Sequence, residues 1–198
     1  ATARRSLNLM GLEWANRGIN LWLVEEGSVT LSTDTATYTL PTDTIDLLEH
    51  TLRTNNGTTS QTDTALIRMS VSTYSQITNK LTSGQPTQIY IDRQRDAPTV
   101  TLWPVPSSTY NGDFIRYFRL RRVQDTGAKS SNNVDIPARF LPCMVAGLSY
   151  YIALKKPEAA QRIPTLKAIY EEQFDLAAEE DREKASLTFT PLSDYYSL

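Results

Sequence analysis

The chain has 198 residues, of which 40% are hydrophobic and 21% are charged, and its formal net charge is -2. This length allows one domain of ordinary size or two small modules that share a core, and the composition is that of a globular protein. A charge so close to zero provides no general attraction to nucleic acid or to an anionic membrane. No apolar run approaches the roughly 20 residues that cross a bilayer, so we expect no membrane association.

The chain holds one cysteine, Cys143, and one histidine, His50. A lone cysteine excludes an internal disulfide, and a zinc site needs about four Cys or His ligands, so we expect no metal and no cofactor. Residues 1–5 carry two arginines with no apolar stretch after them, which is not the pattern of a signal peptide. We therefore expect synthesis in a reducing compartment.

The first segment has helical periodicity. Ala3, Leu7, Met10 and Trp14 recur at spacings of four and three, which places them on one helix face. Gly18 has the position of a helix-terminating residue in the left-handed conformation.

The middle of the chain, residues 19–123, is rich in Thr, Ser, Tyr and Val and is interrupted by turn signals. A turn is expected at Glu26 and Gly27, and Ser72 is expected to cap a short helix that carries Tyr74, Ile77 and Leu81. β-Branched side chains pack well on a pleated surface, so the runs between turns indicate strands. We expect strands at residues 19–25, 28–32, 37–40, 45–53, 87–93, 99–103 and 113–123.

The third region, from residue 136, predicts two helices. Pro137 suits a first helical turn, and Leu141, Val145, Leu148 and Ile152 lie on one face. Pro157 follows the first helix, and a short link leads to a second helix, so the two helices are expected to be antiparallel neighbours. The apolar face of the second helix consists of Ile163, Leu166, Tyr170, Phe174 and Ala177.

The segment at residues 186–198 has no helical period and only one charge, Asp194. Disordered tails are usually polar, so its apolar residues indicate an arm that docks on another surface or packs back on its own domain. The arm residues that we expect in an interface are Leu187, Phe189, Leu192, Tyr195, Tyr196 and Leu198.

These segments together predict the α+β class. An α-helical bundle is expected from the N-terminal helix and the C-terminal antiparallel helix pair, with an antiparallel β-rich domain inserted. The expected boundaries are residues 1–18 and 136–185 for the helical domain, 19–135 for the β-rich domain and 186–198 for the extended C-terminal arm.

No catalytic constellation stands out. His50 is the single candidate base for a Ser-His-Asp triad, but it lies in an apolar run and no G-x-S-x-G motif supplies a serine. Cys143 lies among apolar residues, which favours core packing over a reactive thiol. Adjacent carboxylates on a helix point in different directions, so they make poor acid/base pairs. Such pairs occur at Glu25-Glu26, Glu171-Glu172 and Glu179-Glu180-Asp181.

A strand at residues 114–122 alternates aromatic residues with arginines, which is also the composition of single-stranded nucleic-acid sites. Phe114, Phe118 and Leu120 share one face with Arg116, so at least part of that face is expected to be core. We expect the arginines to pair with acids on a neighbouring strand or subunit, because the net charge does not favour nucleic acid.

The order of these landmarks resembles a known family. The matching stretches are LNLM at residues 7–10, WANRG at 14–18, LWLVEEG at 21–27, YTLPTD at 38–43, GQPTQIY at 84–90, LWPVP at 102–106 and IP at 136–137. They are similar to the head-to-tail adaptor proteins of short-tailed bacteriophages, also called tail tubular protein A. The motifs are individually degenerate, and their order over most of the chain carries the resemblance.

The resemblance implies a structural protein of the virion neck, made in the host bacterial cytoplasm, and not an enzyme. Twelve copies would form a ring that joins the portal protein to the tail nozzle protein, and double-stranded DNA would pass without sequence-specific binding. We expect an acidic helix to face that channel, because a channel in which DNA slides should repel phosphates weakly. The acidic residues concerned are Glu171, Glu172, Asp175, Glu179 and Glu180.

Two alternatives remain open at this point. One is a different phage connector component, such as a head-completion or tail-terminator protein. The other is a carbohydrate-binding or cell-wall hydrolase module, which would need a cleft lined by aromatic residues and carboxylates. Trp22, Trp103 and Tyr110 are its weak aromatic candidates.

Overall fold

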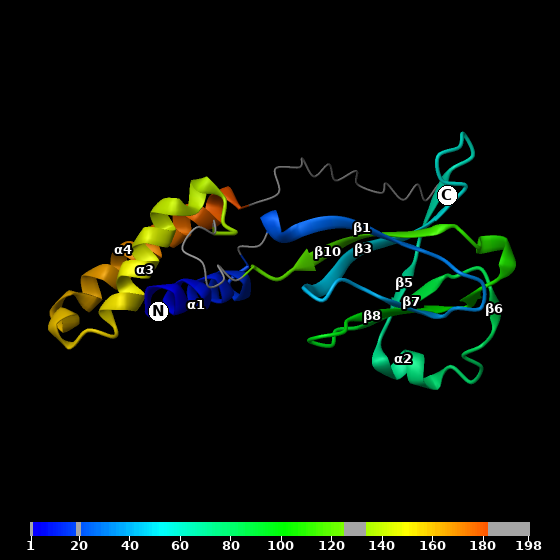
Figure 1. Ribbon diagram of the computed structural model, residues 1–198, viewed down its shortest axis with the longest axis horizontal. Helices are drawn as coiled ribbons and strands as arrows, with labels where there is room; N and C mark the ends of the chain where they lie inside the picture. Colours follow the sequence, from blue (N-terminus) through cyan, green and yellow to red (C-terminus); the bar gives the residue numbers. More distant parts are fainter. Residues whose placement is uncertain (1, 19–20, 125–133, 182–198) are drawn as a thin grey trace, which may run out of the picture.

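The computed structural model describes residues 2–18, 21–124 and 134–181 of the chain. The molecule is elongated, with a group of helices at one end and the β-strands at the other (Figure 1). The N-terminal helix lies with the C-terminal helices, although the β-rich segment separates them in the sequence. The α+β class is therefore confirmed.

Helix α1 (Thr2–Asn16) is amphipathic, with Met10 and Trp14 fully buried. It terminates where the sequence predicts, because Gly18 has a φ of +90°, a conformation that glycine adopts without steric cost. Ala3, which was expected on the buried face, is exposed near the start of the helix.

Two longer helices follow in the C-terminal third. Helix α3 (Leu141–Ala153) is preceded by a single 3₁₀ turn, η3 (Ala138–Phe140), so Pro137 lies just before that turn and not within it. A second 3₁₀ segment, η4 (Pro157–Arg162), leads into α4 (Ile163–Glu180), which carries Pro164 in its first turn.

Helices α1, α3 and α4 share one hydrophobic core. Tyr170, Phe174 and Ala177 of α4 are buried, which confirms that part of the predicted face. Half-buried Trp22, from the 3₁₀ turn η1 (Leu21–Leu23), also packs on this core and donates a hydrogen bond to the carbonyl of Asp135 at 3.1 Å. The fully or largely buried members are Met10, Trp14, Phe140, Cys143, Tyr170, Phe174 and Ala177.

A chain of hydrogen bonds connects α1 to α4 inside this core. The Trp14 indole N–H donates to the Tyr170 hydroxyl at 2.9 Å, and that hydroxyl donates to Glu13 at 3.0 Å. Tyr151 of α3 donates to the same carboxylate at 2.7 Å. Buried polar groups are costly unless they are paired, so this chain sets how the three helices lie against one another.

The larger sheet has the strand order β1-β10-β3-β4, and its pairings are antiparallel. Its long strand β3 ends at Thr54, and the next residue, Asn55, has a positive φ of 53° that begins the turn. The strands are β1 (Val24–Thr30), β10 (Phe114–Arg121), β3 (Thr44–Thr54) and β4 (Thr62–Ala65).

The second sheet has the order β2-β8-β7-β5, and its edge pair β5–β7 is parallel, so the β-rich part is not wholly antiparallel. The strands are β2 (Thr37–Thr39), β8 (Thr99–Trp103), β7 (Gln88–Asp92) and β5 (Ile67–Met69). Two further short strands, β6 (Ser83–Gly84) and β9 (Val105–Pro106), form a parallel pair near the 3₁₀ turn η2 (Ser108–Tyr110).

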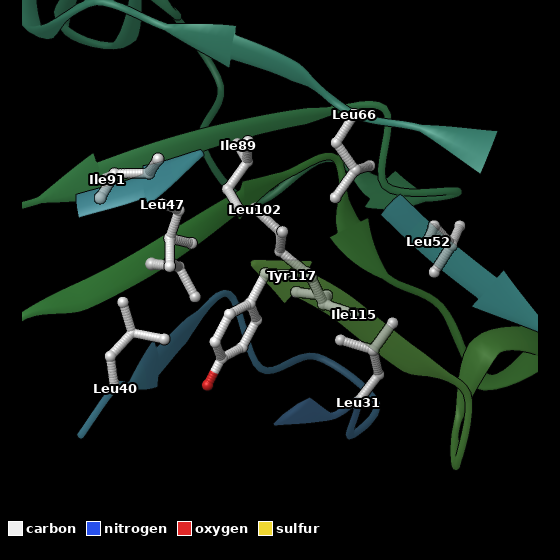
Figure 2. Close-up of a cluster of buried hydrophobic side chains, with 11 residues drawn as sticks. Leu31, Leu40, Leu47, Leu52, Leu66, Ile89, Ile91, Leu102, Ile115 and Tyr117 are labelled. Atoms are coloured by element: carbon white, nitrogen blue, oxygen red, sulfur yellow. The ribbon is translucent and has the colours of Figure 1, made fainter. Parts of the chain in front are cut away.

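The two four-stranded sheets bury a separate hydrophobic core between them (Figure 2). Leu47 and Leu52 of β3, with Ile115 and Tyr117 of β10, face Ile89 and other residues of the second sheet. Burial alternates along β7, so Ile89 and Ile91 share its inward face.

Several sequence-based expectations for the β-rich part are wrong. The strand expected at residues 19–25 begins only at Val24, because residues 21–23 form the 3₁₀ turn η1. The turn at Glu26 and Gly27 does not exist, because β1 continues through both residues. Gly27 is needed there for space, since a Cβ would lie 2.5 Å from the Tyr117 ring. Helix α2 (Val71–Gln76) is shorter than expected and is capped by Ser70, whose side chain accepts from the Thr73 N–H, and not by Ser72.

Another wrong expectation concerns β10, whose buried face is not the one that carries Phe114, Phe118 and Leu120 but the opposite one. Ile115 and Tyr117 are buried, whereas Phe118 is 47% exposed. Both faces of this strand carry large apolar side chains, so alternation alone could not identify the face that meets the second sheet.

Candidate functional site

The predicted acidic residues lie on α4, at the helical end of the molecule. Glu172, Asp175 and Glu179 are exposed, and a helix turns by about 100° per residue, so the three fall within an arc of about 60°. Glu171 is only half-buried and is engaged by Arg17 of α1 at 2.7 Å, so its charge is partly compensated. Glu180 is exposed and borders a groove between α3 and α4.

Helix α3 presents its predicted apolar face to solvent. Leu141 and Val145 are 44% and 60% exposed, and Leu148 and Ile152 are half-buried. The opposite side of the helix, with Cys143 and Gly147, packs into the core. Gly147 permits this close approach, because a Cβ would lie 2.6 Å from the Met10 sulfur.

The sequence did contain a signal for this exposed face. All 13 residues of α3 are uncharged, whereas α4 carries charges on its outward side. A helix that is apolar all round is typically covered on every side, so an uncharged helix with an exposed face indicates a partner.

Ion pairs hold the junction between the helical and β-rich parts. Arg119 of β10 pairs with Glu25 at 2.8 Å and with Asp43 at 2.5 Å. Arg121 pairs with Glu25 at 2.6 Å and binds Asp135 through two nitrogens, a bidentate arrangement that fixes direction as well as distance. The junction therefore has a defined geometry.

The charges at this junction shift the pKa values of the acids. The hydrogen bond from Arg121 lowers the pKa of Asp135. Partial burial acts to raise the pKa of Asp43, but the hydrogen bond and charge of Arg119 outweigh it, and the pKa is lowered. Both carboxyl groups are therefore ionised at neutral pH.

The arginines of β10 pair with acids, as the sequence predicts. Besides Arg119 and Arg121, Arg116 pairs with Glu26 of the neighbouring strand β1. The acids at Glu25 and Glu26 are thus partners of arginines and do not form an acid/base pair with each other. This compensation also removes most of the basic character that a nucleic-acid site requires.

The remaining candidate catalytic groups lie in structural positions. Cys143 is buried, and burial raises the pKa of its thiol to about 12, which disfavours a thiolate. His50 lies on β3 opposite Tyr117, and neither ring nitrogen has a hydrogen-bond partner in the described part of the chain. Burial, followed by the charge of Arg68, lowers its pKa.

The aromatic candidates of the hydrolase alternative are not brought together. Trp22 packs in the helical core, whereas Trp103 of β8 donates to the carbonyl of Asn79, and Tyr110 packs against the core of the β-rich part. Within the described residues, no cluster of three or more Cys, His, Asp or Glu side chains is arranged to bind a metal. None of the described helices has the length and hydropathy of a membrane span.

Two cavities lie at the helical end. The larger, of about 440 Å³, is formed between α1 and the junction, with Leu7, Leu12, Val123 and Ile136 in its wall. The smaller, of about 220 Å³, is the groove between α3 and α4 that Pro142, Leu176 and Glu180 line. Leu187, Phe189, Leu192, Tyr195, Tyr196 and Leu198, which were predicted to form an interface, lie outside the described residues.

The described surface combines an acidic face on α4 with an uncovered apolar face on α3, which is typical of a protein that assembles with others. No curated protein matches the sequence. A family model described as SU10 adaptor protein matches residues 1–193, nearly the whole chain, and it agrees with the resemblance to a phage adaptor. The chain therefore belongs to the SU10 adaptor protein family, whose members are structural adaptor proteins of bacteriophage virions.

Proposed function

We propose that this chain is the adaptor of a phage head-to-tail connector, and that it forms a ring joining the portal protein to the tail nozzle protein. The observation that carries the proposal is the family match over residues 1–193. An uncharged helix with exposed Leu141 and Val145 supports it, because monomeric proteins rarely leave such a face uncovered.

In this proposal the protein is of the tail tubular protein A type, with twelve copies in the ring. Head-to-tail contacts close into a ring when the rotation between subunits fits. The helices, as a bundle, form the inner ring, and the β-rich part faces outward and toward the nozzle. We keep the domain division at residues 1–18 with 136–185, 19–135 and the arm 186–198.

The acidic face of α4 lines the DNA channel in this proposal. Glu172, Asp175 and Glu179 share one exposed face, and Glu180 lies at its edge. Because a sliding duplex must not be held, a lining that repels phosphate weakly favours DNA ejection. Glu171 contributes least, since Arg17 compensates its charge.

The C-terminal arm is proposed to attach the adaptor to the portal or to a neighbouring subunit. Its apolar side chains, among them Phe189 and Tyr195, motivate this assignment. A chain that ends at residue 185 should lose attachment to portal rings but keep its melting temperature. Unchanged attachment would refute the role of the arm.

The main test is negative-stain imaging of the purified chain, alone and mixed with portal rings from the same genome. An additional protein layer beneath the portal is the expected result, and rotational averaging of that layer gives the number of subunits. Portal rings that remain bare at micromolar adaptor concentrations contradict the proposal.

We also propose that the chain has no enzymatic activity. The ion pairs of Glu25 and Glu26 with arginines, together with the high pKa of the Cys143 thiol, support this view. Incubation with purified peptidoglycan should release no soluble fragments, and release by the wild type would favour the cell-wall hydrolase alternative.

A further inference from the structure

The connection between α3 and α4 carries a concentration of positive charge. Lys155 and Lys156 directly follow α3, and Arg162 is the last residue of η4. Lys167 lies in the second turn of α4. All four side chains are exposed, so this end of the helical part presents cations to solvent.

Helix α1 brings two more cations to the same end. The Lys155 ammonium donates to the Ser6 hydroxyl at 2.8 Å, so the start of α1 lies against the end of α3. Arg4 and Arg5 directly precede Ser6 and are exposed. The start of α1 accordingly points toward the turn between α3 and α4 (Figure 1). We call the six residues the basic tip: Arg4, Arg5, Lys155, Lys156, Arg162 and Lys167.

The net charge of the chain conceals this concentration. Residues 2–6 and 154–168 hold the six cations and one acid, Glu158, which lies 3.8 Å from Lys156. The whole chain has a formal net charge of -2, so acids must be in excess elsewhere. The polarisation arises only in the folded chain, because Ser6 and Lys155, which meet at the tip, are 149 positions apart in the sequence.

Helix stability explains only part of the basic tip. Cations are favourable near the C-terminal end of a helix, which accounts for Lys155 and Lys156 after α3. Arg4, Arg5 and Arg162 lie at the starts of α1 and α4, where the helix dipole favours acids instead, and neither first turn contains an acid. The three arginines therefore have no role in stabilising their helices.

The composition of the tip indicates which anion it fits. Protein–protein interfaces are depleted of lysine and enriched in aromatic residues, and sites for single-stranded nucleic acid stack bases on aromatic rings. Residues 2–6 and 154–168 contain three lysines and no aromatic residue. Long, exposed lysine and arginine side chains without aromatic partners are suited to the phosphates of a duplex.

We propose that the basic tip binds the phosphates of double-stranded DNA without regard to sequence. This inference goes beyond the proposed function and does not require the ring. Phosphate contacts exchange readily with salt ions and allow a protein to slide along a duplex, so the tip would guide DNA without stopping it. Lys167 precedes Glu172 by five residues, so α4 carries cations at its start and an acidic face beyond them.

The test is fluorescence anisotropy with labelled DNA duplexes of two unrelated sequences and the purified chain. Both duplexes should bind with equal affinity, since phosphates are common to every sequence. If four cations contact phosphates, the affinity should decrease about 50-fold between about 50 and 150 mM salt.

A double substitution locates the binding at the tip. Arg5→Gln combined with Arg162→Gln should make the slope of log affinity against log salt shallower by about 1.8 and should weaken binding at least about tenfold at about 50 mM salt. Arg93→Gln combined with Arg95→Gln makes the same change of charge at exposed arginines of the β-rich part. This matched control should bind like the wild type, and circular dichroism melts that match the wild type show that both variants are folded.

Three results would overturn the inference. The first is a wild type that binds neither duplex at about 100 μM protein in about 50 mM salt. The second is a tip variant that binds DNA like the wild type, and the third is a control that loses as much affinity as the tip variant.

An acidic protein partner gives a different result. If the wild type leaves DNA free and the tip variant loses binding to portal rings, the tip is a protein contact and the inference fails. A wild type that binds DNA but leaves portal rings bare contradicts the proposed function and leaves the inference intact.

Discussion

Replacing Tyr170 by phenylalanine tests the packing that orients the three helices. The substitution removes only a hydroxyl, so it creates almost no cavity, but that hydroxyl accepts from Trp14 at 2.9 Å and donates to Glu13 at 3.0 Å. Trp14 is completely buried, so its indole N–H would lose its partner without gaining water. Glu13 keeps the Tyr151 hydroxyl at 2.7 Å and contributes little to the loss.

Leaving one buried donor unpaired costs about 1–3 kcal/mol. For a chain of this size, a loss of about 2 kcal/mol corresponds to a decrease of about 4–8 °C in the melting temperature. The measurement is thermal and urea unfolding followed by circular dichroism, at a protein concentration at which analytical ultracentrifugation shows monomers.

Tyr150→Phe provides a matched control on the same face of the core. Tyr150 stacks on Tyr170 with ring centroids 6.1 Å apart, but its hydroxyl has no hydrogen-bond partner in the described part of the chain. Its removal should cost less than about 0.5 kcal/mol. Equal effects of the two substitutions would refute the argument that the Trp14–Tyr170–Glu13 chain holds α1 on α4.

Three further predictions concern single side chains. Gly27→Ala should destabilise the β-rich part by about 1–3 kcal/mol in urea unfolding, because its Cβ would meet the Tyr117 ring at 2.5 Å, and a wild-type midpoint would contradict this. Burial, followed by the charge of Arg68, lowers the pKa of His50, so the unfolded chain takes up the proton more readily as the pH falls below about 6.5. The unfolding midpoint should therefore decrease between pH 7.5 and 5.5, and by less in His50→Gln; equal decreases would exclude this histidine as a cause. Finally, the Cys143 thiol, with its pKa raised to about 12 by burial, should react with a thiol reagent only after denaturation, and fast reaction of the native chain would show that the helical core opens.

Part of the fold was predictable because it depends on local pattern. The end of α1 just before Gly18 follows from a residue that tolerates a positive φ, and the buried face of α4 with Tyr170 and Phe174 follows from periodicity. The pairing of the β10 arginines was also predictable, since arginines beside a strand core need acidic partners. The acidic residues that form the exposed face of α4, which are Glu172, Asp175 and Glu179, could also be identified from the sequence.

The tertiary structure alone decided where apolar faces point and which residues lie close together. Gly27 was taken for a turn residue because nothing in its neighbourhood reveals the Tyr117 ring, which arrives from a strand 90 residues later. The spacing of Leu141, Val145, Leu148 and Ile152 identifies an apolar face of α3 but not the surface that covers it. In this protein α1 and α4 pack on the opposite side of α3, so this apolar face is exposed or only half-buried.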